Sequence, residues 1–132
     1  MSKPFIHAQS SAKKFGGVYS DYLAIHELLD SSKSVISDGR HRALTHNTWF
    51  ISQIIPKIFG EVFTRQSDGV VVSSRDVAEQ HVSEDYANRY IPTAQDFLDN
   101  MDFQDWMNNG KGKPPSHASL TKKREILKIK HD

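Results

Sequence analysis

Three histidines lie on or beside the apolar side of a predicted helix: His26, His41 and His81. Two of them precede an aspartate by four residues, namely Asp30 and Asp85. Because residues four apart share one helix face, each imidazole and its carboxylate can act on the same ligand. The chain has no cysteine, so a transition-metal site must use imidazole and carboxylate groups. We predict that the histidines hold a divalent cation such as Zn, Mn, Fe or Ni, with the aspartates as ligands or orienting groups.

A structural interpretation of the same residues stays open. A histidine on an apolar helix face is commonly a hydrogen-bonding residue of the interior, and a His-to-Asp pair at this spacing is common in surface electrostatics. The H-E-x-x-H pattern of zinc peptidases is absent, and the only His-Asp dipeptide is the terminal pair His131 and Asp132. The recurrence of histidines over three predicted helices favours the metal site.

Cationic and hydroxyl side chains accompany the histidines. Arg40 and Arg42 flank His41, and arginine at the start of a helix opposes the helix dipole, which favours a functional role. Guanidinium and ammonium groups bind phosphate and carboxylate. The alternative is that these cations decorate helix ends and pair with acidic side chains. The predicted binding residues for a phosphate-containing substrate are Ser10, Ser11, Lys14, Lys33, Arg40, Arg42 and Arg75.

Two further side chains are predicted to be catalytic. Glu84 is the candidate general base. His46 points away from His41 on the predicted helix, so it is a poorer ligand and is assigned to catalysis instead. His7 could reach the site from the N-terminal segment. A serine nucleophile fits less well, because no Gly-x-Ser-x-Gly elbow is present.

The segment from His7 to Gly17 gathers hydroxyl groups, two lysines and a glycine pair. Glycine lets backbone N–H groups approach an anion closely, so this segment could cradle a phosphate. Its spacing matches neither the P-loop nor the dinucleotide fingerprint. The alternative, which local sequence favours, is a serine-capped helical turn that ends at Gly16.

The longest predicted helix runs from Asp38 to Phe59 with Asp38 as its N-cap. Apolar side chains follow His41 at close to the helical period. Pro56 lacks the N–H that would bond within the helix, so we expect a kink near Ile55 or the end of a first helix there.

Other helices are predicted over 21–35 and 75–88, with a short one capped by Thr93. Asp68 and Gly69 between β-branched runs predict a hairpin at about 61–73. The fold class is therefore mainly α, as a compact helical domain of four to five helices with one small β-hairpin.

Length and charge divide the chain into a body and a tail. With 132 residues and 37% hydrophobic residues, one core is expected in a domain over 1–108. The first 108 residues carry a net charge of −4, whereas residues 109–132 carry +5 and predict a linker-like tail with a short helix from Leu120 to Lys130. Such a tail suits nucleic acid, an acidic protein partner or the body of the protein itself, and the bland alternative is a solvated terminus. Neither a membrane span nor a secretory signal is apparent, so a cytoplasmic location is expected.

Several motifs occur together in the chain, including His7-Ala-x-Ser-Ser-x-Lys-Lys-Phe-Gly-Gly17, Asp38-x-Arg-His-Arg-Ala-Leu44 and Glu79-Gln-His-Val-x-Glu-Asp85. Together they resemble an uncharacterised domain family found in bacteria and phages. The resemblance spans about Ile6 to Trp106 and implies a bacterial or phage origin but no mechanism. It keeps open a role in conflict between phage and host, including capture of nucleotide signals.

The function that these residues favour is a metal-assisted enzyme acting on a phosphate-containing, nucleotide-derived substrate. One alternative is a non-catalytic protein that binds a nucleotide or nucleic acid, for example a phage counter-defence protein. Another is a component of a larger phage or host assembly that docks through its basic tail. Turnover with bound metal separates the first from the second, and loss of assembly on removing the tail identifies the third.

Overall fold

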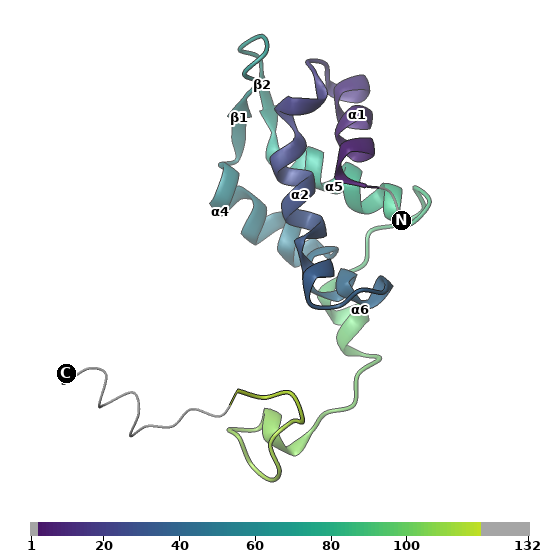
Figure 1. Cartoon of the computed structure of the whole chain (residues 1–132), viewed down its shortest axis with the longest axis vertical. Helices are drawn as coiled ribbons and strands as arrows, with labels where there is room; N and C mark the ends of the chain where they lie inside the picture. The colour runs from purple at the N-terminus through teal and green to yellow at the C-terminus, as the bar shows by residue number, and fades with distance from the viewer. Residues whose placement is uncertain (1–2, 120–132) are drawn as a thin grey trace, which may run out of the picture. The chain divides into compact units, whose positions relative to one another are not determined.

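Short helices form most of the structure, and one β-hairpin lies among them (Figure 1). The computed structural model describes residues 3–119, which divide into two units, one ending at Asn100 and the other beginning at Met101. Each unit is described by itself. The helix predicted from Leu120 to Lys130 lies outside the described residues.

Within residues 3–119, all α-helices and both strands belong to the first unit. The α-helices are α1 (Pro4–Phe15), α2 (Leu23–Asp30), α3 (Arg42–Thr45), α4 (Ile55–Phe59), α5 (Ser74–Asp85) and α6 (Ala94–Leu98). Strands β1 (Val62–Thr64) and β2 (Val71–Ser73) pair antiparallel, with Phe63 opposite Val72. Single turns cover Tyr19–Asp21, Ser31–Ser34, Gly39–His41 and Phe50–Ile54, and the second unit has one at Asp105–Met107. The prediction of a mainly α fold with one small hairpin is confirmed.

The segment from His7 to Gly17 forms the body and end of α1, which confirms the favoured prediction of a helical turn that ends at Gly16, although the N-cap is Lys3 and not a serine. Pro4 occupies the first turn, where its missing N–H costs nothing, and Gly16 ends the helix with φ of 96°. A Cβ on Gly16 would lie 2.7 Å from Arg65 Nη1. The guanidinium of Arg65 donates to the carbonyl of Phe15 and pairs with Asp68. The glycines therefore make room for the Arg65 side chain.

The prediction of one continuous helix from Asp38 to Phe59 is wrong. Asp38 is an N-cap as expected, since its carboxylate accepts from the backbone N–H of Arg40. The chain then breaks at His46, whose ψ is 57°. Asn47 holds this break from both sides, because its amide donates to the carbonyl of Ala43 and its side-chain oxygen accepts from Phe50 N.

Pro56 disturbs the regular helix near Ile55, as predicted. The turn before it, Phe50–Ile54, is π-helical, and Ile55 N bonds to the carbonyl of Phe50 five residues back. The wider turn leads into α4, whose first turn contains Pro56. The predicted central helix is thus divided into α3, a π turn and α4, and six α-helices occur among residues 3–119.

The interior of the first unit mixes apolar and imidazole side chains. Its apolar core contains Ala8, Tyr22, Ile25, Leu29, Phe50, Ile51, Ile55, Val72, Val77, Ala78 and Val82. Five histidines are buried as well, namely His7, His26, His41, His46 and His81. Buried polar groups need partners, so the contacts of these rings must explain much of the fold.

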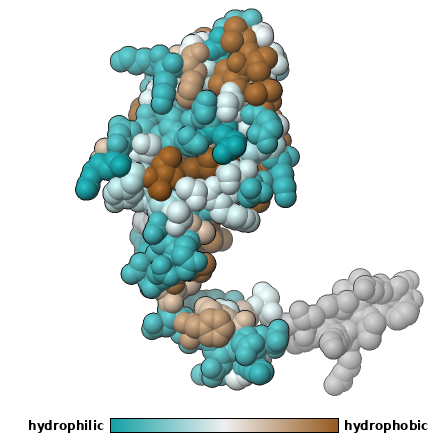
Figure 2. All heavy atoms as spheres, turned by 180° about the vertical axis from the view of Figure 1, so that it is seen from behind, coloured by the Kyte–Doolittle hydropathy of each residue, from teal (hydrophilic) through white to brown (hydrophobic). Residues whose placement is uncertain are grey.

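The face shown in Figure 2 is mainly hydrophilic, and its hydrophobic side chains form separate patches. Over the described residues, no helix has the length and hydrophobicity required to cross a bilayer.

Candidate metal centre

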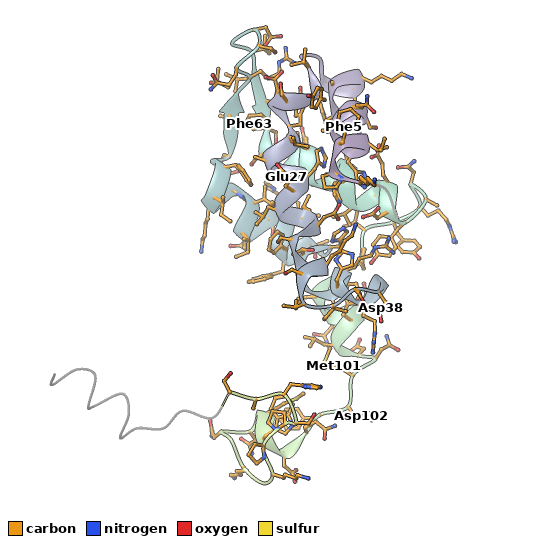
Figure 3. All side chains as sticks on the ribbon, in the orientation of Figure 1. Phe5, Glu27, Asp38, Phe63, Met101 and Asp102 are labelled. Atoms are coloured by element: carbon orange, nitrogen blue, oxygen red, sulfur yellow. The ribbon has the colours of Figure 1, made fainter. Side chains whose placement is uncertain are left out.

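Four buried side chains bring one donor atom each to a common point. Asp30 ends α2, His46 follows α3, and His81 and Asp85 belong to α5. Their donor atoms all lie within 4.8 Å of one another. We call these four residues the His–Asp group. Side chains crowd the region where α2 and α5 overlap in the view of Figure 3, and the group could hold a metal ion.

Both carboxylates of the group sit at an unfavourable end of a helix. Asp30 is the last residue of α2 and Asp85 is the last residue of α5. The C-terminal end of a helix carries the negative end of its dipole, so it favours cations and disfavours carboxylates. Two buried carboxylates in this position indicate that positive charge belongs between them.

The proton on His81 can be assigned by following a chain of hydrogen bonds. Gln80 Nε2 donates to Glu84 Oε1 at 2.7 Å, so Gln80 Oε1 is the atom that accepts from the Ser11 hydroxyl. Ser11 has one proton, and His26 Nε2 must therefore donate to Ser11 Oγ, 2.7 Å away. His26 Nδ1 then accepts from His81 Nδ1 at 2.8 Å. In a neutral His81 ring, Nε2 is then left with its lone pair, and a proton added there would be donated to Asp30 Oδ1.

His46 is fixed in the same sense by a shorter chain. The Thr45 hydroxyl donates to the carbonyl of Leu29 at 2.7 Å, so Thr45 Oγ1 accepts from His46 Nδ1 at 2.8 Å. The Nε2 atom of His46 is therefore the unprotonated nitrogen of the neutral ring, as in a metal-bound histidine.

Both lone pairs point at carboxylate oxygens. His46 Nε2 lies 2.8 Å from Asp85 Oδ2, and His81 Nε2 lies 3.2 Å from Asp30 Oδ1 and 3.4 Å from Asp85 Oδ2. A lone pair facing an anion is repulsive unless a cation or an added proton lies between them. The outer hydrogen bonds thus prepare the ring nitrogens to receive a cation.

Protonation of the group follows the same pattern. Burial lowers the pKa of His46 to about 4 despite the nearby Asp85. Burial raises the pKa of Asp85, but hydrogen bonds from the His46, His7 and His81 rings, in the state where these rings carry the proton, outweigh burial and hold that pKa well below its usual range. The pKa of Asp30 is likewise lowered by His81 against the effect of burial. Two ionised carboxylates therefore face an imidazole that resists protonation.

His7 and Glu84 border the group. His7 Nδ1 donates to Glu84 Oε1 at 2.8 Å, and His7 Nε2 lies 3.3 Å from Asp85 Oδ1 without a hydrogen bond. Burial lowers the pKa of His7, but its contacts with Asp85 and Glu84 are stronger and raise it overall. Glu84 also accepts from Ser10 and Gln80. Glu84 is engaged as an acceptor on both oxygens, whereas His7 Nε2 still has capacity for a partner.

Two cations lie at the outer edge of the group. Arg42 Nη2 is 3.9 Å from Asp85 Oδ1, and Lys33 Nζ is 3.7 Å from Asp30 Oδ2. Both side chains remain partly exposed. They are the two predicted substrate-binding cations that the structure brings to the His–Asp group.

The other predicted substrate-binding residues have different surroundings. Arg40 pairs with the exposed carboxylate of Asp38. Lys14 lines a cavity of about 300 Å³, and Arg75 lines another of about 160 Å³. No residue of the His–Asp group lines either cavity. Ser10 and Ser11 face Glu84 and His26 inside the helical unit.

The structure brings together only some of the metal ligands that were predicted from the sequence. Asp30, His81 and Asp85 converge, joined by His46, which we assigned to catalysis. His26 stands behind His81 and bonds to its Nδ1 atom. His41 is buried against the hydroxyl of Ser32 at 2.7 Å. The break that places His46 arises at Asn47, whose tendency to cap helices was the available signal.

Fold and site together define a small helical domain with two buried carboxylates and two imidazoles able to hold a metal ion. The chain belongs to a family described as a domain of unknown function (DUF6915), whose model matches residues 2–107. The resemblance to an uncharacterised domain family is thereby confirmed. No curated protein and no solved structure matches the chain.

Proposed function

We propose that the protein is a metal-dependent hydrolase that acts on a phosphate-containing, nucleotide-derived substrate. The observation that carries the proposal is the convergence of two imidazole lone pairs and two ionised carboxylates on one buried point. The ligands are Asp30, His46, His81 and Asp85. His26 and Thr45 are positioning residues, because they act through the rings of His81 and His46.

The chemistry of the four donor groups limits which metal ions suit the site. Two imidazoles and two carboxylates suit Mn, Fe or Ni, which take six ligands and would retain two open positions for water and substrate. Zinc in a four-coordinate site would be saturated by the same donors. We therefore favour a six-coordinate ion of the Mn or Fe type for catalysis.

Partly exposed cations next to the ligands supply the means of binding an anion. Arg42 and Lys33 each approach one ligand carboxylate from outside. A phosphate held at Arg42 could be bound through two of its oxygens at once, because guanidinium presents paired N–H groups. Their position favours phosphate esters over neutral substrates.

Asp30, His46, His81 and Asp85 would hold the divalent cation, which when bound would lower the pKa of a water and polarise a phosphoryl oxygen. The water oxygen bonds to phosphorus, the phosphorus–oxygen bond to the leaving group breaks, and the leaving oxygen ends protonated. His7 Nε2 is placed to accept the proton of the water, with Glu84 holding the opposite ring nitrogen. Arg42 offsets the charge that develops on the phosphoryl oxygens.

The burial of all four ligands supports a second candidate. Their side chains are at most 5% exposed, which suits a structural metal that joins α2, α3 and α5. In that case the protein would bind nucleotide without turning it over. Turnover separates the two candidates, because a structural metal gives protein that is metal-loaded and inactive.

Elemental analysis and a phosphoesterase assay on the same preparations test the proposal. The parent protein is expected to hold close to one equivalent of metal and to hydrolyse bis(4-nitrophenyl) phosphate. His46→Gln should lose both properties, whereas His41→Gln, the matched buried control, should keep the metal. A folded parent that takes up no Mn, Fe, Ni or Zn would end the metal-centre proposal.

A further inference from the structure

An aromatic pair lies next to the His–Asp group. The chain turns sharply after α5, where Ala87 and Asn88 both have φ of 58°, a left-handed conformation that is uncommon outside glycine. This turn returns Tyr90 to Tyr86, and their rings lie 5.3 Å apart at an interplanar angle of 33°. Such backbone strain is often found where a functional surface must be held in place.

Arginines accompany both rings. The guanidinium of Arg42 lies 5.4 Å from the ring centre of Tyr86, and that of Arg89 lies 5.6 Å from the ring centre of Tyr90. The order is therefore Arg42, Tyr86, Tyr90 and Arg89, a pair of tyrosine rings with one arginine on each side. Aromatic faces accompanied by cations are the composition of surfaces that stack nucleic-acid bases.

Arg42 links this surface to the candidate metal centre. The same guanidinium that lies near the Tyr86 ring is 3.9 Å from Asp85 Oδ1. Its Nε atom is buried and has no hydrogen-bond partner among the described residues. A phosphate held at Arg42 would therefore have the tyrosine pair beside it.

Tyr90 supplies the accessible ring. Its residue surface is 53% exposed, although an aromatic side chain gains from burial. An aromatic ligand that covered this ring would bury apolar surface and gain stacking. Tyr19 is similarly exposed, at 44%, but its ring packs against Phe5. Arg42 and Arg89 lie over other rings.

We infer that Tyr90, with Tyr86, Arg42 and Arg89, forms the binding site for the base of a nucleotide whose phosphate lies at the His–Asp group. This inference rests on the proposed function for the location of the phosphate. It adds the requirement that the substrate carry an aromatic base. Stacking does not distinguish one base from another, so binding should tolerate different bases.

Calorimetric titration of the metal-loaded full chain provides the test, with adenosine 5′-monophosphate and ribose 5-phosphate as a matched pair of ligands. Phosphate release is followed in the same samples. The nucleotide should bind at least about tenfold more tightly than the sugar phosphate, as expected for one stacked base. Tyr90→Ala should remove this difference without weakening ribose 5-phosphate. Tyr90→Phe should keep it, and Tyr19→Ala should have no effect.

Equal affinity for the two ligands in the parent, or a preference that survives Tyr90→Ala, would overturn the inference. Failure of the proposed function would give a different experimental result. Metal would then be absent, or ribose 5-phosphate would bind equally to parent and Arg42→Gln. A nucleotide preference that depends on Tyr90 would still stand in that case.

Discussion

Two charged regions of the helical unit, one partly exposed and one buried, satisfy their charges in opposite ways. The first, which we call the Arg65 corner, consists of Gly16, Gly17, Arg65 and Asp68. Its guanidinium pairs with Asp68 and donates to the Phe15 carbonyl. In the second region, the His–Asp group, Asp30 and Asp85 face ring nitrogens that carry no proton in the assigned network.

The two regions differ in how well their donors and acceptors match. In the corner, donors and acceptors match, and the hydrogen bonds raise the pKa of Arg65 and lower that of Asp68. In the His–Asp group, Asp30 Oδ2 is buried without a hydrogen bond and lies 3.7 Å from Lys33. A complete ion pair needs no further partner, whereas an excess of buried acceptors would be satisfied by a cation.

The largest expected effect is stabilisation by metal. Addition of Mn, Fe or Ni at 100 to 1,000 times the dissociation constant should stabilise the fold by about 3–4 kcal/mol. The melting temperature would rise by about 10 °C or more. Differential scanning calorimetry before and after chelation measures the change. Asp85→Asn should abolish it, and Asp68→Asn in the corner should leave it intact. A shift of the same size in Asp85→Asn would break the comparison.

The second largest effect is expected from a substitution in the Arg65 corner. Gly17 has φ of 74°, and a Cβ there would lie 2.5 Å from Asp21 Oδ2 and 2.8 Å from Arg65 Cδ. Gly17→Ala should therefore cost about 2–3 kcal/mol through strain and overpacking. Gly69→Ala is the matched control, because Gly69 also has positive φ but no atoms within 4 Å of the added carbon, and about 1 kcal/mol is expected. Urea unfolding compares the two, and equal losses would contradict the packing argument.

A smaller effect is expected from the hydrogen-bonded chain behind His81. Ser11→Ala removes the acceptor that fixes the proton of His26. Loss of such an outer contact typically weakens metal binding by about 10- to 100-fold. Competition with a chromogenic chelator gives the dissociation constant. Ser10→Ala, which removes only a contact to Glu84, should weaken binding less, and the reverse order would refute the assigned chain.

The smallest effect is a pH dependence of the metal-free protein. Burial, followed by the charges of His81 and His7, lowers the pKa of His26 to about 2, and burial lowers that of His46 to about 4. The unfolded chain takes up these protons below about pH 6.5 while the folded chain does not, so stability falls as pH decreases. His7 acts in the opposite direction because its pKa is raised.

The net loss between pH 7 and pH 6 should be about 1 kcal/mol. Urea unfolding of chelator-treated protein at the two pH values measures it. The contribution of Asp68, whose pKa is lowered by Arg65, is present at neutral pH and is lost only below about pH 4. A stability that stays constant from pH 7 to 6 would contradict neutral buried histidines.

Sequence reasoning found the features that depend on local chemistry. Asp68 and Gly69 predicted the hairpin, and Thr93 with Asp96 predicted a capping box that the structure contains. Spacing of four residues correctly placed His81 and Asp85 on one side of α5. These features require only a few neighbouring residues, so their physics is visible in the sequence.

The exchange of His41 for His46 required information that spacing does not contain. A continuous helix from Asp38 to Phe59 would have placed the two rings in different directions. Asn47 satisfies backbone groups on both sides of a break instead, and periodicity cannot weigh that competition. The directions of the hydrogen bonds through Gln80 and Ser11 likewise depend on α1 packing against α5, a tertiary contact.

The ligands are also widely separated along the chain, and this has a kinetic consequence. His81 lies 51 residues from Asp30, so the set is complete only when α5 has docked against α2. Contacts at such separation tend to form late on the folding path. Bound metal should therefore slow unfolding far more than it accelerates folding, and the loaded protein would gain its persistence from a long native-state lifetime.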